Sequence, residues 1–206
     1  MAEVKIEQMD NMQFDVLREI GNIGAGNATT ALSQMLSAKV DMKVPKIELL
    51  EFQELAELIG GAENIVVGIL LTLQDDIDGM MMFLLEKTSA KNIVRMLMGG
   101  YGENGAEEFS EMELSAMQEI GNIIAGAYLS SLSTLTNLTI TSSVPYMAID
   151  MAGAILSVPA IEFGKISDKA LLIQTEFGDE GTEVNGYFIL IPTLESYSRI
   201  LTSLGL

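Results

Sequence analysis

The feature that most constrains this chain of 206 residues is an internal repeat. Residues 13–45 align with residues 113–145 without a gap, and "EIGNIGAG" at 19–26 returns as "EIGNIIAG" at 119–126. Residues 78–99 correspond to residues 185–205 at a slightly larger offset. Two copies are too few for a solenoid, which needs about three or more. We therefore expect one internally duplicated domain with a pseudo-two-fold axis.

Each repeat predicts the same order of elements: a long helix, a strand, a short irregular or helical piece, a hairpin and a closing helix. This order predicts an α+β fold, in which an antiparallel sheet packs with two long equivalent helices. We expect a single domain over 1–206, with repeats at about 11–99 and 111–206 and a linker at about 100–110. The expected long helices are 11–36 and 111–136, the first strands 39–50 and 138–149, the short pieces 52–60 and 150–158, and the hairpin turns 75–79 and 178–186.

Local signals support these boundaries. Asp10 with Gln13, and Ser110 with Glu113, match the capping-box pattern at the start of each long helix. Gly99 fits the end of the closing helix of the first repeat. Proline cannot donate a hydrogen bond to a sheet, so Pro45 and Pro145 restrict the first strands to an edge, a start or a bulge.

Composition excludes several functions. The net charge is −18 with only 11 Lys and Arg residues, which argues against nucleic acid and against an anionic membrane surface. The chain has no Cys and no His, which leaves carboxylates, amides, hydroxyls or an oxygen-bound metal for any chemistry. No apolar run approaches the roughly 20 residues that span a bilayer, and the lack of Cys is typical of a cytoplasmic protein.

The glycine-rich stretch "EIGNIGAGN" resembles a phosphate-binding loop at first sight. A P-loop, however, would need Lys at Asn27 and a hydroxyl at Ala28, and the dinucleotide fingerprint fails at Thr29. Both motifs also follow a strand, whereas a helix start precedes this stretch. We expect close packing between the long helices or against their sheet at the small residues Gly21, Gly24, Ala28, Gly121 and Ala125, together with Tyr128.

Packing does not explain the polar residues of the same helices. Asp15, Glu19 and Asn22 are spaced i, i+4, i+7 and therefore share one helix face. Ser115, Glu119 and Asn122 repeat the spacing. Each stripe could be a solvated face, but its recurrence favours a surface that is used.

These positions resemble the CheC/CheX/FliY phosphatases of bacterial chemotaxis, whose signature is [DS]-x3-E-x2-N-x22-P. The first repeat matches at Asp15, Glu19, Asn22 and Pro45, and the second at Ser115, Glu119, Asn122 and Pro145. The resemblance covers the whole chain. It implies a protein phosphatase that hydrolyses the aspartyl phosphate of the response regulator CheY.

The resemblance also implies roles. Glu19 and Glu119 would dock to a lysine of CheY, Asn22 and Asn122 would position the attacking water, and Asp15 and Ser115 would support them. Pro45 and Pro145 would be structural. The chain would need no cofactor of its own, because Mg²⁺ would be supplied by bound CheY.

Other expectations follow from the same resemblance. CheD is an implied partner, for which Asp150 and the apolar segment after it are a candidate contact, although a core helix is the alternative there. We expect the chain to be monomeric on its own. Gly21 and Gly121 precede the proposed catalytic Asn residues, and a side chain there would block entry into another protein. The competing hypothesis is a non-catalytic CheY- or CheD-binding module, like the middle domain of FliM.

Overall fold

The computed structural model describes residues 11–36, 41–98, 108–163, 169–179 and 182–206. Six helices and seven strands occupy these residues. The helices are α1 Asn11–Leu36, α2 Phe52–Leu58, α3 Lys87–Leu97, α4 Glu111–Thr136, α5 Ala152–Phe163 and α6 Leu194–Ser203. The strands are β1 Asp41–Glu51, β2 Ile65–Asp75, β3 Gly79–Glu86, β4 Ile140–Ser142, β5 Tyr146–Met151, β6 Lys169–Asp179 and β7 Thr182–Pro192.

All strands join one antiparallel sheet in the order β1-β6-β7-β3-β2-β4, with β5 also paired to β2. The order exchanges strands between the halves of the sequence. The first strand of the first half, β1, pairs with β6 of the second half, and β5 of the second half pairs with β2 of the first. The central pair, β3 with β7, brings corresponding strands of the two repeats together.

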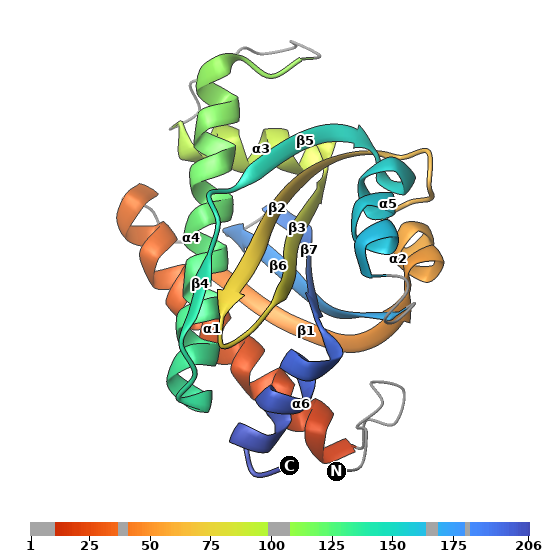
Figure 1. Ribbon diagram of the computed structural model, residues 1–206. Helices are drawn as coiled ribbons and strands as arrows, with labels where there is room; N and C mark the ends of the chain where they lie inside the picture. Colours follow the sequence, from red (N-terminus) through yellow and green to blue (C-terminus); the bar gives the residue numbers. More distant parts are fainter. Residues whose placement is uncertain (1–10, 37–40, 99–107, 164–168, 180–181) are drawn as a thin grey trace.

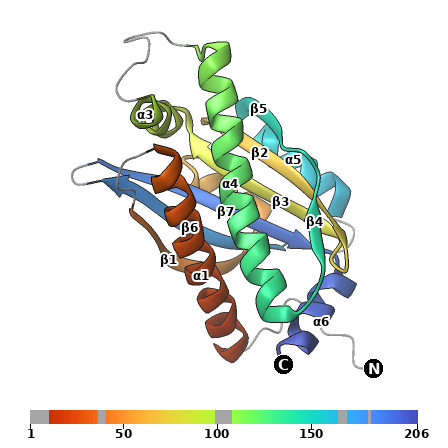
Figure 2. The same ribbon diagram turned by 90° about the vertical axis from the view of Figure 1, so that its left-hand side faces the viewer.

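Helices cover both faces of the sheet. The long helices α1 and α4 lie side by side on one face and run in opposite directions, while α2 and α5 cover the other face (Figures 1 and 2). Successive side chains of a strand point to opposite faces, so the central strands contribute side chains to two hydrophobic cores, one on each face of the sheet. Phe83 packs under the long helices, and its neighbours Met82 and Leu84 pack under α2 and α5.

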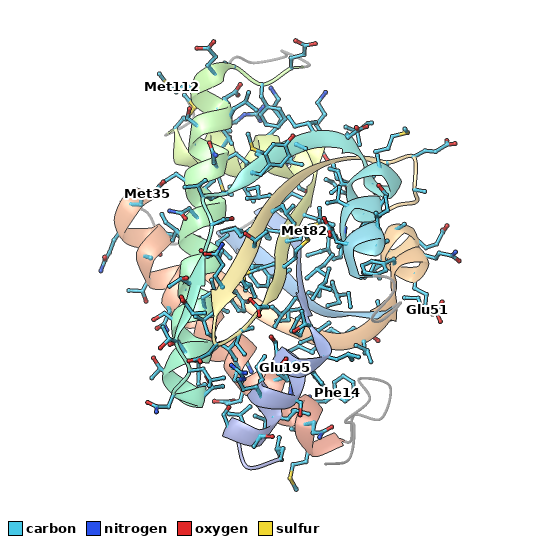
Figure 3. The ribbon with its side chains drawn as sticks, in the orientation of Figure 1. Phe14, Met35, Glu51, Met82, Met112 and Glu195 are labelled. Carbon is cyan, nitrogen blue, oxygen red and sulfur yellow. The ribbon has the colours of Figure 1, made fainter. Side chains whose placement is uncertain are left out.

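This arrangement explains why the central strands read as continuous apolar runs. Every residue of β3 from Gly79 to Leu85 is buried, because neither face of that strand meets solvent. Figure 3 shows the contrast between Met82, which is within the protein, and Met35 and Met112, which project from the outer helices.

The structure confirms most predicted elements. The long helices begin and end as expected, and the capping box of Ser110 and Glu113 is formed. Asp10 and Gly99, expected to cap helices, lie outside the described residues, as does most of the expected linker. The first hairpin turns between β2 and β3, within the expected segment.

Two expectations about strands were wrong. The expected strand 138–149 is broken into β4 and β5 at residues 143–145, where regular pairing stops although the backbone N–H of Ser143 still donates a 2.9 Å hydrogen bond to the carbonyl oxygen of Thr72. The second hairpin turn is much shorter than 178–186, since Asp179 already pairs with Thr182. Backbone pairing continues through this polar segment because ladder hydrogen bonds do not require apolar side chains.

Candidate functional site

The polar residues of α1 form an exposed stripe. Asp15, Glu19 and Asn22 lie on the outer surface of the helix. Leu17 and Ile20, which lie between them in sequence, are buried in the core beneath α1. We call Asp15, Glu19 and Asn22 the first stripe.

The second stripe lies at the equivalent place on α4. Ser115, Glu119 and Asn122 are exposed, while Met117 and Ile120 are each only 1% exposed beneath them. The structure thus places both predicted sets of polar residues on the surfaces of the long helices. Each set belongs to its own helix.

The two stripes have different neighbours at one aligned position. In α1 this position is Arg18, whose guanidinium forms an ion pair with Asp15. In α4 it is Gln118, whose Nε2 donates a 2.8 Å hydrogen bond to the carbonyl oxygen of Pro145. The second stripe is therefore tied to the segment between β4 and β5, whereas Arg18 is engaged within the first stripe itself.

Both prolines of the repeated motif lie where the sheet is interrupted. Pro45 lies in β1, an outer strand of the sheet order, where the register with β6 shifts between Lys43 and Lys46. Pro145 directly precedes β5. The prediction that these prolines occur at an edge, a start or a bulge is confirmed.

Gly24 allows the two long helices to pack closely. A Cβ at Gly24 would lie 2.7 Å from Cδ1 of Tyr128, whose ring stacks on Phe188 at a centroid distance of 4.5 Å. Tyr128 is thus held between α1 and β7. A second contact joins the helices nearby, where Asn27 Nδ2 donates a 3.0 Å hydrogen bond to Ser131 Oγ.

Gly121 faces the sheet. A Cβ there would lie 2.5 Å from Cδ1 and 2.8 Å from Cγ2 of Ile69, and both Gly121 and Gly21 are buried. The hypothesis that this glycine keeps the outer surface clear for a partner is therefore wrong for Gly121, because a side chain there would point inward. The packing interpretation of the buried glycines is confirmed for Gly24 and Gly121.

Gly26 and Gly126 differ from the buried Gly24 and Gly121. Both are exposed in the middle of a helix, and a Cβ added to either would meet nothing within 4 Å. A glycine inside a helix costs about 1 kcal/mol relative to alanine. Neither glycine has a contact in the described structure that requires the absence of a side chain.

A buried carboxylate fixes the start of α4. Glu113 Oε2 accepts hydrogen bonds from the backbone N–H of Ser110 at 2.7 Å and from its hydroxyl at 3.0 Å, and Lys91 Nζ lies 3.7 Å away. The hydrogen bond from the Ser110 backbone holds the pKa of Glu113 below its ordinary value, although burial opposes this shift. Lys91 also covers the ring of Phe109, so α3 and the entry to α4 are joined.

Asp150 lies apart from the second stripe. It is exposed near the end of β5, and its Oδ1 accepts a 2.7 Å hydrogen bond from the backbone N–H of Met151. At about 3.3 Å per residue, β5 separates it from Pro145 by roughly 15 Å. The apolar segment after it forms α5, whose Ile155 and Leu156 are buried against the sheet, as the core-helix alternative predicted.

Two further properties concern the described residues alone. No group of three or more acidic side chains among them is arranged to hold a metal ion. None of their helices is both long and apolar enough to cross a membrane.

Sequence reasoning missed Gln118 and treated all glycines of the long helices as one group. The Gln118 contact with Pro145 joins residues 27 positions apart, and no local pattern predicts it. The two kinds of glycine could have been separated by helical periodicity. Gly26 and Gly126 follow the stripe Asn residues by four positions, which places them on the outer face.

The fold is shared with solved structures of FliY and of the middle domain of FliM. FliY from Thermotoga maritima superimposes with a TM-score of 0.77 at 24% sequence identity, over 96% of this chain and 98% of that one. The FliM middle domain from H. pylori gives a TM-score of 0.65 at 12% identity, over 95% of this chain and 99% of that one. The architecture therefore defines a class of duplicated α+β proteins that includes FliY and the middle domain of FliM.

Sequence comparison narrows this class to a family. The model of the CheC-like family matches residues 12–49 and 112–147, which contain both stripes and both motif prolines. The CheY-P phosphatase CheC of Bacillus subtilis is 36% identical over 197 residues, which are 94% of each chain. A putative CheY-P phosphatase of Halobacterium salinarum, CheC1, is 23% identical over 95% of this chain and 98% of its own length. The chain belongs to the CheC family.

Proposed function

We propose that this protein is a phosphatase that removes the aspartyl phosphate of the phosphorylated response regulator CheY. The observation that carries the proposal is the pair of exposed Glu and Asn residues on each long helix. They lie in a chain that is 36% identical to a relative named as a CheY-P phosphatase. The substrate would be a folded protein that binds against the exposed face of α1 or α4.

The proposed step is hydrolysis of an acyl phosphate by water. The carboxamide of Asn22 or Asn122 enters the active site of CheY and orients a water molecule for in-line attack on phosphorus. The phosphorus–oxygen bond to the aspartate breaks, and inorganic phosphate leaves. An amide suits this task because it donates and accepts hydrogen bonds without changing charge.

The energetic requirement is small. An acyl phosphate is already reactive, and an acceleration of roughly a hundredfold to a thousandfold needs a barrier lower by only about 3–4 kcal/mol. Orientation of a reactant contributes as much as about 7–11 kcal/mol in favourable cases. Amide side chains orient the attacking water in GTPases, which gives the same role a precedent in phosphoryl transfer. Neither histidine nor a nucleophile is required.

The remaining residues of each stripe would dock and support. Glu19 and Glu119 lie one turn before the Asn residues and would contact a lysine beside the phosphorylated aspartate. Asp15 and Ser115 lie one turn earlier, at the rim of the contact. The Mg²⁺ ion of the reaction would arrive bound to CheY.

The alternative is a binding module without catalysis. Its support is the fold shared with the middle domain of FliM. CheD is proposed as a second partner in either case, with exposed Asp150 as a contact residue. The lifetime of CheY-P distinguishes the two functions. A phosphatase shortens it, whereas a binding module leaves it unchanged.

The experiment follows loss of phosphate from CheY-P with the wild type, Asn22→Ala, Asn122→Ala and the double variant. Both side chains are exposed, so we expect unchanged thermal stability in all variants. We expect the wild type to shorten the CheY-P lifetime and the double variant to leave it near that of CheY-P alone. A double variant as fast as the wild type would overturn the site assignment. No acceleration by the wild type, with or without CheD, would favour the binding module.

A further inference from the structure

Gly26 and Gly126 lack an internal reason to be glycine. Each lies within a helix of 26 residues, and neither has the positive φ that favours glycine. Gly24 and Gly121, in contrast, are required by Tyr128 and Ile69. The outer glycines therefore weaken both helices without improving any packing contact in the described residues.

Their position relates them to the stripes. Gly26 follows Asn22 by four residues, and Gly126 follows Asn122 by four residues, so each lies one turn further along the same helix face. In a helix, the Cα–Cβ bond is tilted toward the N-terminus, and a side chain covers the turn before its own Cα. A side chain at position 126 would consequently lean over the turn that carries Asn122, and position 26 stands in the same relation to Asn22.

No side chain therefore projects from Gly26 or Gly126, one helical turn after each stripe Asn. The helix backbone at Gly26 and Gly126 is open to a partner, because a Cβ there would meet nothing within 4 Å. This openness occurs in both repeats, although the buried contacts of the two helices differ. At the position where α1 has Gly24, α4 has the buried Ile124.

We infer that Gly26 and Gly126 are clearance residues that let the backbone around the phosphorylated aspartate of the response regulator approach the helix closely. This inference rests on the proposed function and adds a specificity determinant to each site. The side chain of Asn is short, so its carboxamide reaches a phosphate only if the partner comes near the helix backbone. A side chain one turn beyond the Asn holds the partner away.

The test separates the two sites. Gly126→Ala and Gly126→Leu are made in an Asn22→Ala background, where the second stripe alone is active, and Gly26→Leu is made in an Asn122→Ala background. We expect each leucine to lower kcat/KM for CheY-P by at least about tenfold, the scale of forcing extra volume into a packed contact. We expect Gly126→Ala to lower it less, while raising Tm by about 2–4 °C. A loss of activity with a gain in stability is not the behaviour of a structural residue.

The control is Thr134→Leu in the same Asn22→Ala background. Thr134 is exposed on α4 two turns beyond Gly126, so the added bulk should leave kcat/KM unchanged. The inference is overturned if Gly126→Leu keeps the activity of its background, or if Thr134→Leu loses as much. The proposed function fails separately if the wild type, with or without CheD, does not accelerate the loss of phosphate from CheY-P.

Discussion

Gln118 and Pro145 are joined by a 2.8 Å hydrogen bond from the side-chain amide to the backbone carbonyl. The contact links the motif proline of the second repeat to the helix that carries the second stripe. Gln118 directly precedes Glu119 in α4, and Pro145 ends the break between β4 and β5. At the aligned position of the first stripe, Arg18 forms an ion pair with Asp15.

Gln118→Met should release the segment before β5. The substitution keeps the length of the side chain but removes its hydrogen-bond donor. We expect global stability to fall by only about 0.5–1.5 kcal/mol, as for a typical hydrogen bond. Hydrogen exchange of the backbone amides of Ser143, Val144 and Tyr146 should become faster, since Pro145 has no amide hydrogen. Arg18→Met is the matched control, and equal exchange in Gln118→Met and wild type would contradict the proposed tie.

Gly24→Ala should destabilise the contact between the long helices. The added methyl group would lie 2.7 Å from the ring of Tyr128, which cannot move freely because it stacks on Phe188. We expect a loss of about 1–3 kcal/mol in the free energy of unfolding, measured with urea. Combined with Tyr128→Leu, the substitution should cost less than the sum of the two single changes. Purely additive losses would show that the ring is not the obstacle.

Gly121→Ala should lower stability rather than activity. Its methyl group would point into Ile69 on β2, away from the outer surface, and about 1–3 kcal/mol of stability should be lost. Activity per folded molecule should remain that of the wild type. The comparison is with Gly126→Ala on the same helix, which should raise Tm. If Gly121→Ala kept its Tm and lost activity, the inward orientation would be refuted.

The stability contributed by Glu113 should depend on pH. Its pKa is lower in the folded protein than in the unfolded chain, so the unfolded state binds more protons as both titrate. The contribution is complete above the unfolded pKa of about 4.3 and is lost as pH falls through the lower folded pKa. Wild type should therefore exceed Glu113→Gln in unfolding free energy most at neutral pH, and the difference should shrink below about pH 4.5. Urea titrations at several pH values measure it, and a difference that grows on acidification would show the opposite shift.

Local patterns in the sequence predicted the elements well. The long helices were visible from periodicity and from the capping box of Ser110 and Glu113, since these signals depend on residues close in the chain. The exposed stripes followed from the same helical spacing. The signature linking Glu19 and Asn22 to Pro45 also lies within one stretch of about 30 residues, so the family was recognisable before the fold.

Contacts between distant residues were not predictable in this way. Nothing in the local pattern of β1 indicates that its neighbour is β6, and nothing near Gln118 indicates a bond to Pro145. At Gly121 the sequence supported both a packing role and an outward role beside Asn122, because the local pattern alone does not show which side of α4 meets the sheet. Its contact with Ile69 depends on how α4 sits on the sheet.

The exchange of strands between the two halves has a consequence for how the protein is made. Glu51 at the end of β1 pairs with Lys169, and β1 has no other neighbour in the strand order. At about 5–20 residues per second, the ribosome needs roughly 6–24 s to add the intervening ~120 residues. Throughout that interval the first strand of the nascent chain must wait without its partner. The second copy of the repeat therefore completes the folding of the first, and translation sets the earliest time at which it can do so.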